Sequence, residues 1–249
     1  MSKSRIALVT GGGSGIGAAI CRKLASDGYF VYLNSRRVNN QVLELADEIK
    51  SAGGRCRIIE FDVTNRSEIL QALQNGFTHS RLDALINNAG VLKDNLIYQI
   101  EAEDWNKIIQ TNFFGAFSVF RLLEDKLLNA DRARVVSIAS ISGMRPRKGQ
   151  LPYAVSKAML IEWTRKMSAH TGSESARFFA VSPGPVTTRL IMNTPWYKDR
   201  KSAQRIPLGR YAEATEIASL VSYLLTDTCC IKNGSNIVID GGFMQTAKE

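Results

Sequence analysis

The sequence predicts an α/β fold assembled from βαβ units, and three observations lead to this prediction. Short apolar runs of strand length alternate with segments of helical periodicity along the chain. A glycine-rich turn joins the first apolar run to the first helical segment, and polar residues follow the ends of several later runs. The 249 residues contain no linker-like stretch, so we expect residues 1–249 to form a single domain.

The bulk composition is that of an ordinary globular protein in a reducing compartment. Hydrophobic residues make up 45% of the chain, and no window approaches the ~18 uninterrupted apolar residues of a membrane helix. The apolar run after residues 1–5 is too short for the core of a signal peptide. The cysteines form no CxxC pair, which argues against a disulfide framework or a zinc site: they are Cys21, Cys56, Cys229 and Cys230. We expect a cytoplasmic protein without membrane contact or bound metal.

A dinucleotide-binding turn is predicted near the N-terminus. The apolar strand 5–10 leads into the sequence TGGGSGIG at residues 10–17, and residues 18–26 then show helical periodicity. Glycines let the backbone approach a pyrophosphate, and the helix N-terminus offers it N–H groups and the positive end of a dipole. The alternative is a loop whose glycines are merely flexible. The residues expected to hold the cofactor here are Thr10, Gly11, Ser14, Gly15, Ile16 and Gly17.

The end of the second predicted strand, residues 30–34, indicates which dinucleotide is bound. An NAD site places an acidic residue at this point to accept the ribose hydroxyls, but here the sequence continues Ser35-Arg36-Arg37. No carboxylate would repel a 2′-phosphate and two guanidinium groups could hold it, so we predict NADPH/NADP+ as the cofactor. One or both arginines could instead be solvated at the strand end, and Arg37 is the better candidate for that role.

The other elements follow from periodicity and from helix start and stop signals. We predict an N-cap at Asn65 for a helix that runs to about residue 79. Further helices are expected over residues 42–52, 103–128, 153–169 and 215–225, and strands over residues 57–61, 82–86, 135–138, 177–181 and 236–239. The two histidines, His79 and His170, are far apart, which disfavours a histidine-based triad or metal site.

The segment YAVSK at residues 153–157 carries the candidate chemistry. Tyr153 and Lys157 are four residues apart on a predicted helix, about one turn, so the ammonium can favour the phenolate and make the hydroxyl a usable acid. Ser140 lies 13 residues upstream, just after the buried strand 135–138, where α/β folds place their chemistry. Taken alone, Tyr153 and Lys157 could equally be a pair on a helix surface.

Four motifs together resemble the short-chain dehydrogenase/reductase family in order and spacing. They are TGGGSGIG, NNAG at residues 87–90, a serine 13 residues before YAVSK, and Pro183-Gly184 after a strand. The resemblance covers essentially the whole chain. It implies a single Rossmann-like, doubly wound domain with a seven-stranded parallel sheet, helices on both faces, and hydride transfer with NAD(H) or NADP(H). Residues 10–112 would mainly bind cofactor, and residues 140–157 would carry catalysis.

The resemblance assigns the catalytic roles. A ketone that accepts hydride develops charge on its oxygen, which calls for hydrogen-bond donors and a proton. Tyr153 is expected to supply the proton and Ser140 to be the second donor. Ser137 and Ser142 compete for the serine role, and the spacing favours Ser140. Lys157 is expected to lower the pKa of the phenol and to hydrogen-bond the nicotinamide ribose.

Asn112 and the ends of the later strands complete the expected site. By resemblance, Asn112 bends its helix and holds a water that links Lys157 to solvent; otherwise it is a satisfied buried amide. Besides Tyr153 and Lys157, further cofactor contacts are expected from Asp62, Val63, Asn88, Ala89, Gly90, Pro183, Gly184, Val186 and Thr188.

Three segments most resemble the 3-oxoacyl-[acyl-carrier-protein] reductases. They are VLKDNL at residues 91–96, EDWNKIIQTN at residues 103–112 and IPLGRYAEATEIA at residues 206–218. These enzymes reduce a 3-oxoacyl thioester on a phosphopantetheine arm. The resemblance thus implies an acyl carrier protein as partner and biosynthesis of the fatty acid or polyketide type. It also implies a homo-oligomer, expected to be a tetramer.

The charge distribution agrees with an acidic partner. The chain has 32 basic and 23 acidic residues, and the segments 145–148 and 189–210 carry +8 of its net charge of +9. Residues 189–210 show no clear period and are predicted to form a substrate lid. A basic rim would attract a carrier protein, whereas the alternative is that these residues only solubilise a mobile lid. The docking candidates are Arg145, Arg147, Lys148, Arg189, Lys198, Arg200, Lys201 and Arg205.

Other functions remain open at this point. The enzyme could instead act on a free small ketone, sugar or steroid, or the chain could be an NADP(H)-binding regulator or scaffold. Nucleic acid is disfavoured as a partner because no basic helix or aromatic platform is evident. The joint presence of Asn112, Ser140, Tyr153 and Lys157 favours catalysis over a scaffold role.

Overall fold

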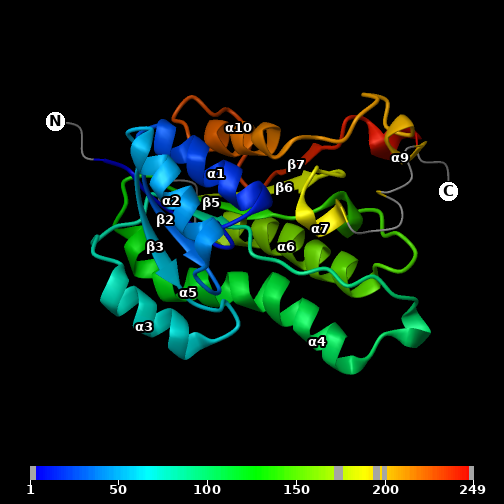
Figure 1. Cartoon of the computed structure of the whole chain (residues 1–249), viewed down its shortest axis with the longest axis horizontal. Coiled ribbons are helices and arrows are strands. Elements are labelled where there is room, and N and C mark those ends of the chain that lie inside the picture. The colour runs from blue at the N-terminus through cyan, green and yellow to red at the C-terminus, as the bar shows by residue number, and fades with distance from the viewer. Residues whose placement is uncertain (1–3, 171–175, 193–196, 198–200, 247–249) are drawn as a thin grey trace.

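A computed structural model describes residues 4–170, 176–192, 197 and 201–246 of the chain. Within them, seven parallel strands form one sheet in the order β3-β2-β1-β4-β5-β6-β7. Helices cover both faces of this sheet (Figure 1). The architecture confirms the predicted doubly wound α/β fold with its seven-stranded parallel sheet.

Apolar runs identify the central strands because those strands are covered on both faces. Every residue of β1 (Ile6–Val9), β4 (Ala84–Asn87) and β5 (Ala133–Ile138) is buried. The strands beside them are β2 (Phe30–Ser35) and β6 (Ala176–Pro183). The edge strands are less buried, and they are β3 (Arg55–Glu60) and β7 (Asn236–Ile239). The predicted strand ends agree with these bounds to within two residues.

One face of the sheet carries the helices α1 (Gly15–Ser26), α2 (Asn40–Ser51) and α10 (Ala214–Leu224), in the upper part of Figure 1. Their apolar sides share a core with residues of β1, β2 and β4. Asn39 caps α2, because its side chain accepts the backbone N–H of Val42. This layer supports the turn that follows β1.

The opposite face carries α3 (Arg66–Gly76), α4 (Ala102–Ile109), α5 (Gly115–Leu128) and α6 (Leu151–His170). Asn65 is the N-cap of α3, as predicted, since its side chain accepts the N–H groups of Ser67 and Glu68. The helix ends at Gly76, before the predicted end near residue 79. Phe77 is extended there and stacks its ring on Tyr32, with centroids 4.3 Å apart.

The segment predicted as one helix over residues 103–128 is helical throughout, but its middle, where Asn112 lies, is not α-helical. Between α4 and α5 the chain forms a π-helical turn, η2 (Gln110–Phe114). The remaining short helices are η1 (Ile97–Gln99), η3 (Ile141–Gly143), α7 (Arg189–Met192), α9 (Lys201–Gln204) and α11 (Phe243–Thr246). Within the described ranges, no helix combines the length and apolarity needed to cross a membrane.

The strand order places the crevice for a ligand between β1 and β4. The chain winds outward from β1 through β2 to β3, and then returns to β4 on the other side of β1. In open parallel sheets, ligands bind at the carboxyl ends of the strands at such a reversal. The TGGGSGIG turn follows β1 and the NNAG segment includes the end of β4, so both motifs border this crevice.

Candidate active site

The glycine turn at the end of β1 is fixed by groups from the end of β4. Gly11 and Gly15 have positive φ angles of 61° and 53°, a region that residues with side chains rarely enter. The Thr10 hydroxyl accepts the backbone N–H groups of Asn88 at 3.0 Å and Ala89 at 3.1 Å. In return, the Asn88 amide donates to the carbonyl oxygens of Thr10 and Gly11. The two motifs therefore form one hydrogen-bonded unit.

The start of α1 has the features that a pyrophosphate requires. Ser14 precedes the helix without a side-chain cap, and the first turn contains no acidic residue, so its N–H groups can face an anion. Gly17 is needed here because an added Cβ would collide with the Gly11 carbonyl oxygen. One cleft gathers the predicted cofactor residues of this region with Arg189: Gly11, Ser14, Gly15, Ile16, Asn88, Ala89, Gly90, Thr188 and Arg189. These residues fit a dinucleotide.

The two arginines after β2 differ in their surroundings. Arg37 lies 3.6 Å from a carboxylate oxygen of Glu60 and of Glu68. Arg36 is exposed, and within the described part of the chain its guanidinium has no ion-pair or hydrogen-bond partner. Asn34 is buried, and its amide bonds the glycine turn and two carbonyl oxygens at the end of β3. Arg36 is thus the more available cation for a 2′-phosphate.

Asp62 and Val63, predicted to border the adenine, also organise the end of β3. Asp62 accepts the Thr64 N–H at 2.8 Å and the Thr64 hydroxyl at 2.7 Å. Val63 is buried against Gly115, the first residue of α5, where an added Cβ would lie 2.6 Å from the valine methyl. This segment therefore holds the cofactor side of the sheet close to the π-helical turn.

The segment after β6 lies across the cofactor cleft from the glycine turn. Pro183-Gly184 ends β6, and the Gly184 N–H donates to the carbonyl oxygen of Ile239 at 2.9 Å. Val186 is buried and forms an isolated parallel bridge with Ala212, shortly before α10. Thr188 faces Gly15, where an added Cβ would lie 3.4 Å from the threonine methyl. Of the predicted contacts in this segment, Thr188 lines the cofactor cleft, whereas Gly184 lines the pocket beside Tyr153.

Tyr153, Ser140 and Lys157 converge at the end of β5. On α6, the Lys157 Nζ lies 5.6 Å from the centre of the Tyr153 ring. Ser140 and Tyr153 line the same pocket, and the interaction of the Ser140 side chain with the Tyr153 hydroxyl acts to lower the pKa of the phenol. Because the Ser142 N–H donates to Ser140 Oγ at 3.1 Å, the serine can use its own proton as a donor. The Lys157 ammonium donates to the Ile138 carbonyl oxygen at 2.7 Å.

The geometry separates Ser140 from the two competing serines. Ser137 is fully buried within β5, and its hydroxyl has no partner among the described residues. The Ser142 hydroxyl donates to the Gln150 side chain at 3.1 Å. Of the three, Ser140 is the one whose side chain affects the pKa of Tyr153.

Burial dominates the protonation of Tyr153 and Lys157. It raises the pKa of Tyr153 to about 12, although the interaction with Ser140 acts in the opposite direction. It lowers the pKa of Lys157 to about 8. The net shift of the phenol is therefore opposite to the predicted lowering, because loss of solvation outweighs the stabilisation of the phenolate.

Asn112 lies fully buried in the π-helical turn and joins it to α6. Its Oδ1 accepts the Val91 N–H at 2.7 Å, and its Nδ2 donates to the Val91 carbonyl oxygen and to the Ser156 hydroxyl, both at 3.0 Å. A Cβ added to Gly90 would lie 3.3 Å from Asn112 Oδ1 and 3.6 Å from Lys157 Nζ. The side chain is thus a satisfied buried amide that stands close to the lysine.

A polar pocket beside Tyr153 is lined by Gln150, which pairs with Asp94, a residue outside the pocket lining. Neither Gln150 nor Asp94 is among the site residues predicted from the sequence. Gln150 is buried, and its Nε2 lies 3.2 Å from both carboxylate oxygens of Asp94. Burial raises the pKa of Asp94. The only sequence signal was the presence of Asp94 in VLKDNL and of Gln150 three residues before Tyr153. The pocket is lined by Leu92, Ser140, Ile141, Ser142, Arg147, Gln150, Tyr153, Gly184, Pro185 and Ile191.

Two of the basic docking candidates make internal contacts instead of forming an open rim. Arg145 is half-buried and donates to the Met244 carbonyl oxygen at 3.1 Å. Arg147 is also half-buried, lies 4.6 Å above the centre of the Phe243 ring, and lines the polar pocket. Both arginines therefore attach their segment to the C-terminal helix α11.

Three of the other docking candidates are described, and all three are exposed. Arg189 donates to Gln41 at 2.8 Å and borders the cofactor cleft. Lys148 and Arg205 are exposed. Lys198, Arg200 and the side chain of Lys201 lie outside the described residues.

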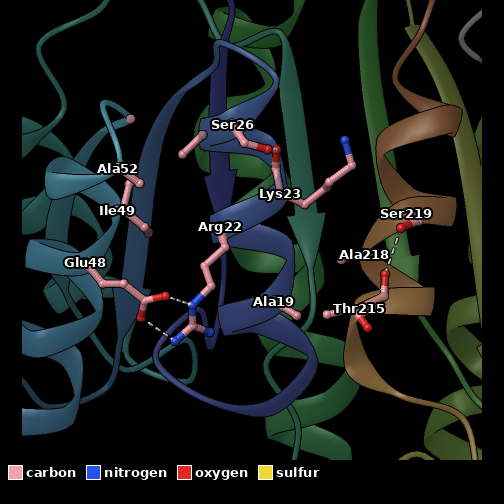
Figure 2. Close-up of a pocket in the computed structure, with 12 residues that line it drawn as sticks. Ala19, Arg22, Lys23, Ser26, Glu48, Ile49, Ala52, Thr215, Ala218 and Ser219 are labelled. Carbon is pink, nitrogen blue, oxygen red and sulfur yellow. Dashed lines mark hydrogen bonds and ion pairs between the residues drawn. The ribbon is translucent and has the colours of Figure 1, made fainter.

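A separate groove runs along the outer face of α1, between α2 and α10 (Figure 2). It has a volume of about 370 Å³ and a largely apolar lining. At its rim, the Arg22 guanidinium donates two hydrogen bonds to the Glu48 carboxylate, at 2.8 and 2.7 Å. None of the residues predicted for catalysis or for cofactor binding lines this groove, so it lies apart from the chemical site.

Comparison with known proteins agrees with the geometry. Residues 5–198 match the model of the short chain dehydrogenase family. The 3-oxoacyl-[acyl-carrier-protein] reductase of Synechocystis is 30% identical over 97% of both chains, and that of Thermotoga maritima is 29% identical over 97% of this chain and 98% of its own.

A crystal structure from Agrobacterium tumefaciens, provisionally assigned as a gluconate dehydrogenase, is also similar. It superposes with a TM-score of 0.89 at 28% identity, covering 98% of this chain and 97% of its own. With the glycine turn, the serine, the tyrosine and the lysine in register on this fold, the chain belongs to the short chain dehydrogenase family of oxidoreductases.

Proposed function

We propose that the protein is an NADPH-dependent reductase of 3-oxoacyl thioesters, with the acyl group carried on an acyl carrier protein. The observation that carries this proposal is the convergence of Ser140, Tyr153 and Lys157 on a pocket beside the cofactor cleft. The names of the similar reductases supply the substrate class. The proposed product is the 3-hydroxyacyl thioester.

Each of these side chains has its own role in carbonyl reduction. A bound nicotinamide dinucleotide would supply hydride to the carbonyl carbon. Ser140 and Tyr153 donate hydrogen bonds to the carbonyl oxygen, and the Tyr153 hydroxyl then gives its proton to that oxygen. Lys157 stabilises the phenolate that this transfer leaves behind, a role made stronger by the low dielectric around both groups. Asn112, close to Lys157, would complete the path by which the proton is replaced.

The cofactor preference rests on Arg36. Its exposed guanidinium follows β2, at the position where NAD-binding sites carry a carboxylate. A 2′-phosphate there would gain a charge-assisted hydrogen bond, whereas NADH offers only a hydroxyl. Arg37 contributes less to the proposal because two carboxylates already face it.

The carrier protein would dock at the mouth of the polar pocket. Lys148 and Arg205 are exposed basic residues of the predicted rim, and residues 189–210 would act as the lid. Attraction between this rim and an acidic carrier would raise the rate of association. We further propose a cytoplasmic homotetramer that serves biosynthesis of the fatty acid or polyketide type.

A second candidate is oxidation or reduction of a free polar substrate such as a sugar acid. The pocket favours it in one respect, because Ser142, Arg147 and Gln150 give its wall a polar character. The name of the Agrobacterium protein is consistent with this class. The same pocket also suits the first candidate, because Leu92, Ile141 and Ile191 offer the apolar contacts that a long acyl chain would need.

A comparison of substrates at two salt concentrations tests the proposal. NADPH oxidation is followed with one 3-oxoacyl group presented on carrier protein, on coenzyme A and as the free ketone, and NADP+ reduction is followed with gluconate. We expect the carrier-bound substrate to be fastest and to lose this advantage at high salt. Equal, salt-insensitive rates would refute docking, and activity restricted to gluconate would establish the second candidate.

Three variants sharpen the assignment. Tyr153→Phe should lower kcat about 100-fold or more while NADPH still binds, because it removes the proton donor. The pair Lys148→Gln and Arg205→Gln should raise KM for the carrier substrate only. Lys50→Gln, which removes an exposed charge from α2, is the matched control and should change neither value. Normal turnover by Tyr153→Phe would refute the catalytic role.

A further inference from the structure

A second polar cavity lies at the amino-terminal edge of the sheet, opposite the catalytic edge. Arg5, Tyr29 and Asp83 immediately precede β1, β2 and β4, and Arg134 is the second residue of β5. The cavity has a volume of about 490 Å³ and is completed by Arg81, Asp131, Arg132, Leu225 and Asp227. A volume of this order is typical of sites for small molecules.

Arg134 is a buried cation whose positive charge is only weakly balanced by a nearby carboxylate. Its residue is 5% exposed, and its Nη1 donates to the carbonyl oxygens of Arg132 and Ala133. Its Nε has no hydrogen-bond partner among the described residues. The carboxylate of Asp227 is 4.0 Å from Nη2 and belongs to a side chain that is 71% exposed. Burial and the nearby Arg177 both lower the pKa of Arg134, so its charge is costly as it stands.

Two of the other basic groups of the cavity have weak partners. The Arg5 guanidinium lies 4.4 Å above the centre of the Tyr29 ring and has no carboxylate partner among the described residues. Arg132 makes a long contact, 3.5 Å, to the exposed Asp227. Arg81 is paired, because its Nε lies 3.4 Å from the Asp83 carboxylate, which also accepts the N–H of Ile6 at 2.7 Å.

The positive charge of the cavity therefore exceeds its negative charge. Four arginines face three carboxylates, and the buried member of the set is an arginine. Buried charges are stable when they are paired and hydrogen-bonded. A ligand that brings negative charge and several acceptor atoms would meet this requirement.

We propose that this cavity binds a phosphate group, either as inorganic phosphate or as a small phosphate monoester. A phosphate presents several acceptor oxygens at once, and guanidinium groups match them with paired donors. Arg5, Arg132 and Arg134 would hold the phosphate oxygens. Tyr29 and Leu225 form an apolar wall that could receive the organic part of a monoester. This site is independent of the proposed reductase function, because it lies at the other edge of the sheet.

Calorimetric titration of the NADP+-saturated protein tests the site, since the saturated cofactor cleft no longer offers phosphate contacts. The probes are inorganic phosphate, glycerol 3-phosphate and adenosine 5′-monophosphate, each at constant ionic strength in chloride. We expect saturable binding at one site per chain. Tighter binding of either monoester than of inorganic phosphate would identify the organic group as part of the ligand, and equal binding would identify phosphate alone.

Variants locate the binding. Arg5→Gln and Arg132→Gln alter exposed side chains and should each weaken binding about tenfold, the effect of one lost charge-assisted hydrogen bond. Arg165→Gln removes a comparably exposed arginine from α6 and should leave the Kd unchanged. In Arg134→Lys, the charge remains while the paired donors are lost, so binding should weaken although the protein folds. No saturable heat, or an unchanged Kd in both Arg5→Gln and Arg132→Gln, would overturn the proposal.

Discussion

At the scale of single residues, the two arginines after β2 show how neighbours decide the value of a charge. Arg36 and Arg37 are adjacent and chemically identical, yet only Arg37 has nearby carboxylates, from Glu60 and Glu68 at 3.6 Å. A guanidinium already faced by two anions gains less from a phosphate than one that is only solvated. The pair therefore forms a built-in comparison for cofactor recognition.

We predict that Arg36→Ala raises the KM for NADPH about tenfold, with little change for NADH, since it removes one charge-assisted contact to the 2′-phosphate. Arg37→Ala should change the KM for NADPH less than threefold, a bound set by the small worth of a shared surface charge. Steady-state kinetics with both cofactors measures these values. If both substitutions raised the KM for NADPH equally, the ion pairs of Arg37 would not reduce its contribution to cofactor binding.

Lys157 gives the protein a pH dependence whose sign follows from its burial. Its pKa in the folded protein is about 8, below the ordinary lysine value of 10.5. Between these two values the unfolded chain binds a proton that the folded chain lacks, so the free energy of unfolding rises with pH. Below about pH 8 both states are protonated, and the buried charge costs on the order of 3 kcal/mol.

Urea unfolding of wild type and Lys157→Met at about pH 7.5 and about pH 10 isolates this effect. The wild type should gain more stability than the variant between the two pH values, because the variant has no ammonium to neutralise. Lys157→Met also removes the hydrogen bond to the Ile138 carbonyl oxygen. Because methionine does not titrate, this loss lowers the stability of the variant equally at both pH values and cancels when the change between them is compared. The window stops near pH 10 because Tyr153, whose pKa is raised to about 12, contributes the opposite slope above it. Parallel pH profiles for both proteins would contradict the burial argument.

At the scale of elements, the π-helical turn between α4 and α5 depends on Asn112. Three side-chain hydrogen bonds hold this residue: the bond to Ser156 is buried, and the two bonds to Val91 are part-buried. We expect Asn112→Ala to lower the free energy of unfolding by about 2–4 kcal/mol, because it leaves the Val91 backbone groups without partners. Asn106→Ala, an exposed asparagine on α4, is the control and should cost less than about 1 kcal/mol. Urea unfolding measures both, and similar losses would refute the role of the turn.

The same turn shows where prediction from the sequence reaches its limit. Periodicity predicts a helix over residues 103–128 but does not distinguish an α-helix from the π-helical turn at its middle. There the Asn112 side chain bonds Val91, 21 residues earlier in the chain, a contact that periodicity cannot reveal. The strands are predictable since their burial on both faces appears directly as apolar runs. Helix α3 ends early for a similar long-range reason, the stacking of Phe77 on Tyr32.

The candidate site likewise contains some residues that the sequence predicts and others that it does not. The glycine turn, Ser140 and the Tyr153–Lys157 spacing are local patterns, so the sequence locates them. The buried Gln150 hydrogen-bonds the exposed Asp94, 56 residues away in the chain, and no short pattern reveals this pair. Charge counting also has a limit: it places Arg145 and Arg147 on a basic rim, whereas both make internal contacts with the C-terminal helix. A side chain's partners, not its charge alone, determine its availability to a ligand.

At the scale of the whole molecule, the C-terminal end of the chain closes the substrate side of the site. After β7, α11 returns to the segment that connects Ser140 to Tyr153, where Met244 accepts from Arg145 and Phe243 lies under Arg147. Thr246 donates to the Arg205 carbonyl oxygen, which adds the end of the predicted lid to the same assembly. The cofactor cleft draws on the first half of the chain and on residues 188 and 189. Substrate binding should therefore be alterable without loss of cofactor binding.

We predict that Phe243→Ala raises the KM for the carbonyl substrate about fivefold while the Kd for NADPH stays unchanged. The substitution removes the ring that fixes the Arg147 guanidinium in the polar pocket, and a partly buried cation–π contact contributes about 1 kcal/mol. Phe243→Tyr keeps the ring and should retain the wild-type KM, which separates this effect from a general loosening of α11. Steady-state kinetics and a fluorescence titration of NADPH make the two measurements. If the cofactor Kd rises with the KM, or if Phe243→Tyr behaves like Phe243→Ala, the C-terminal segment does not act through Arg147.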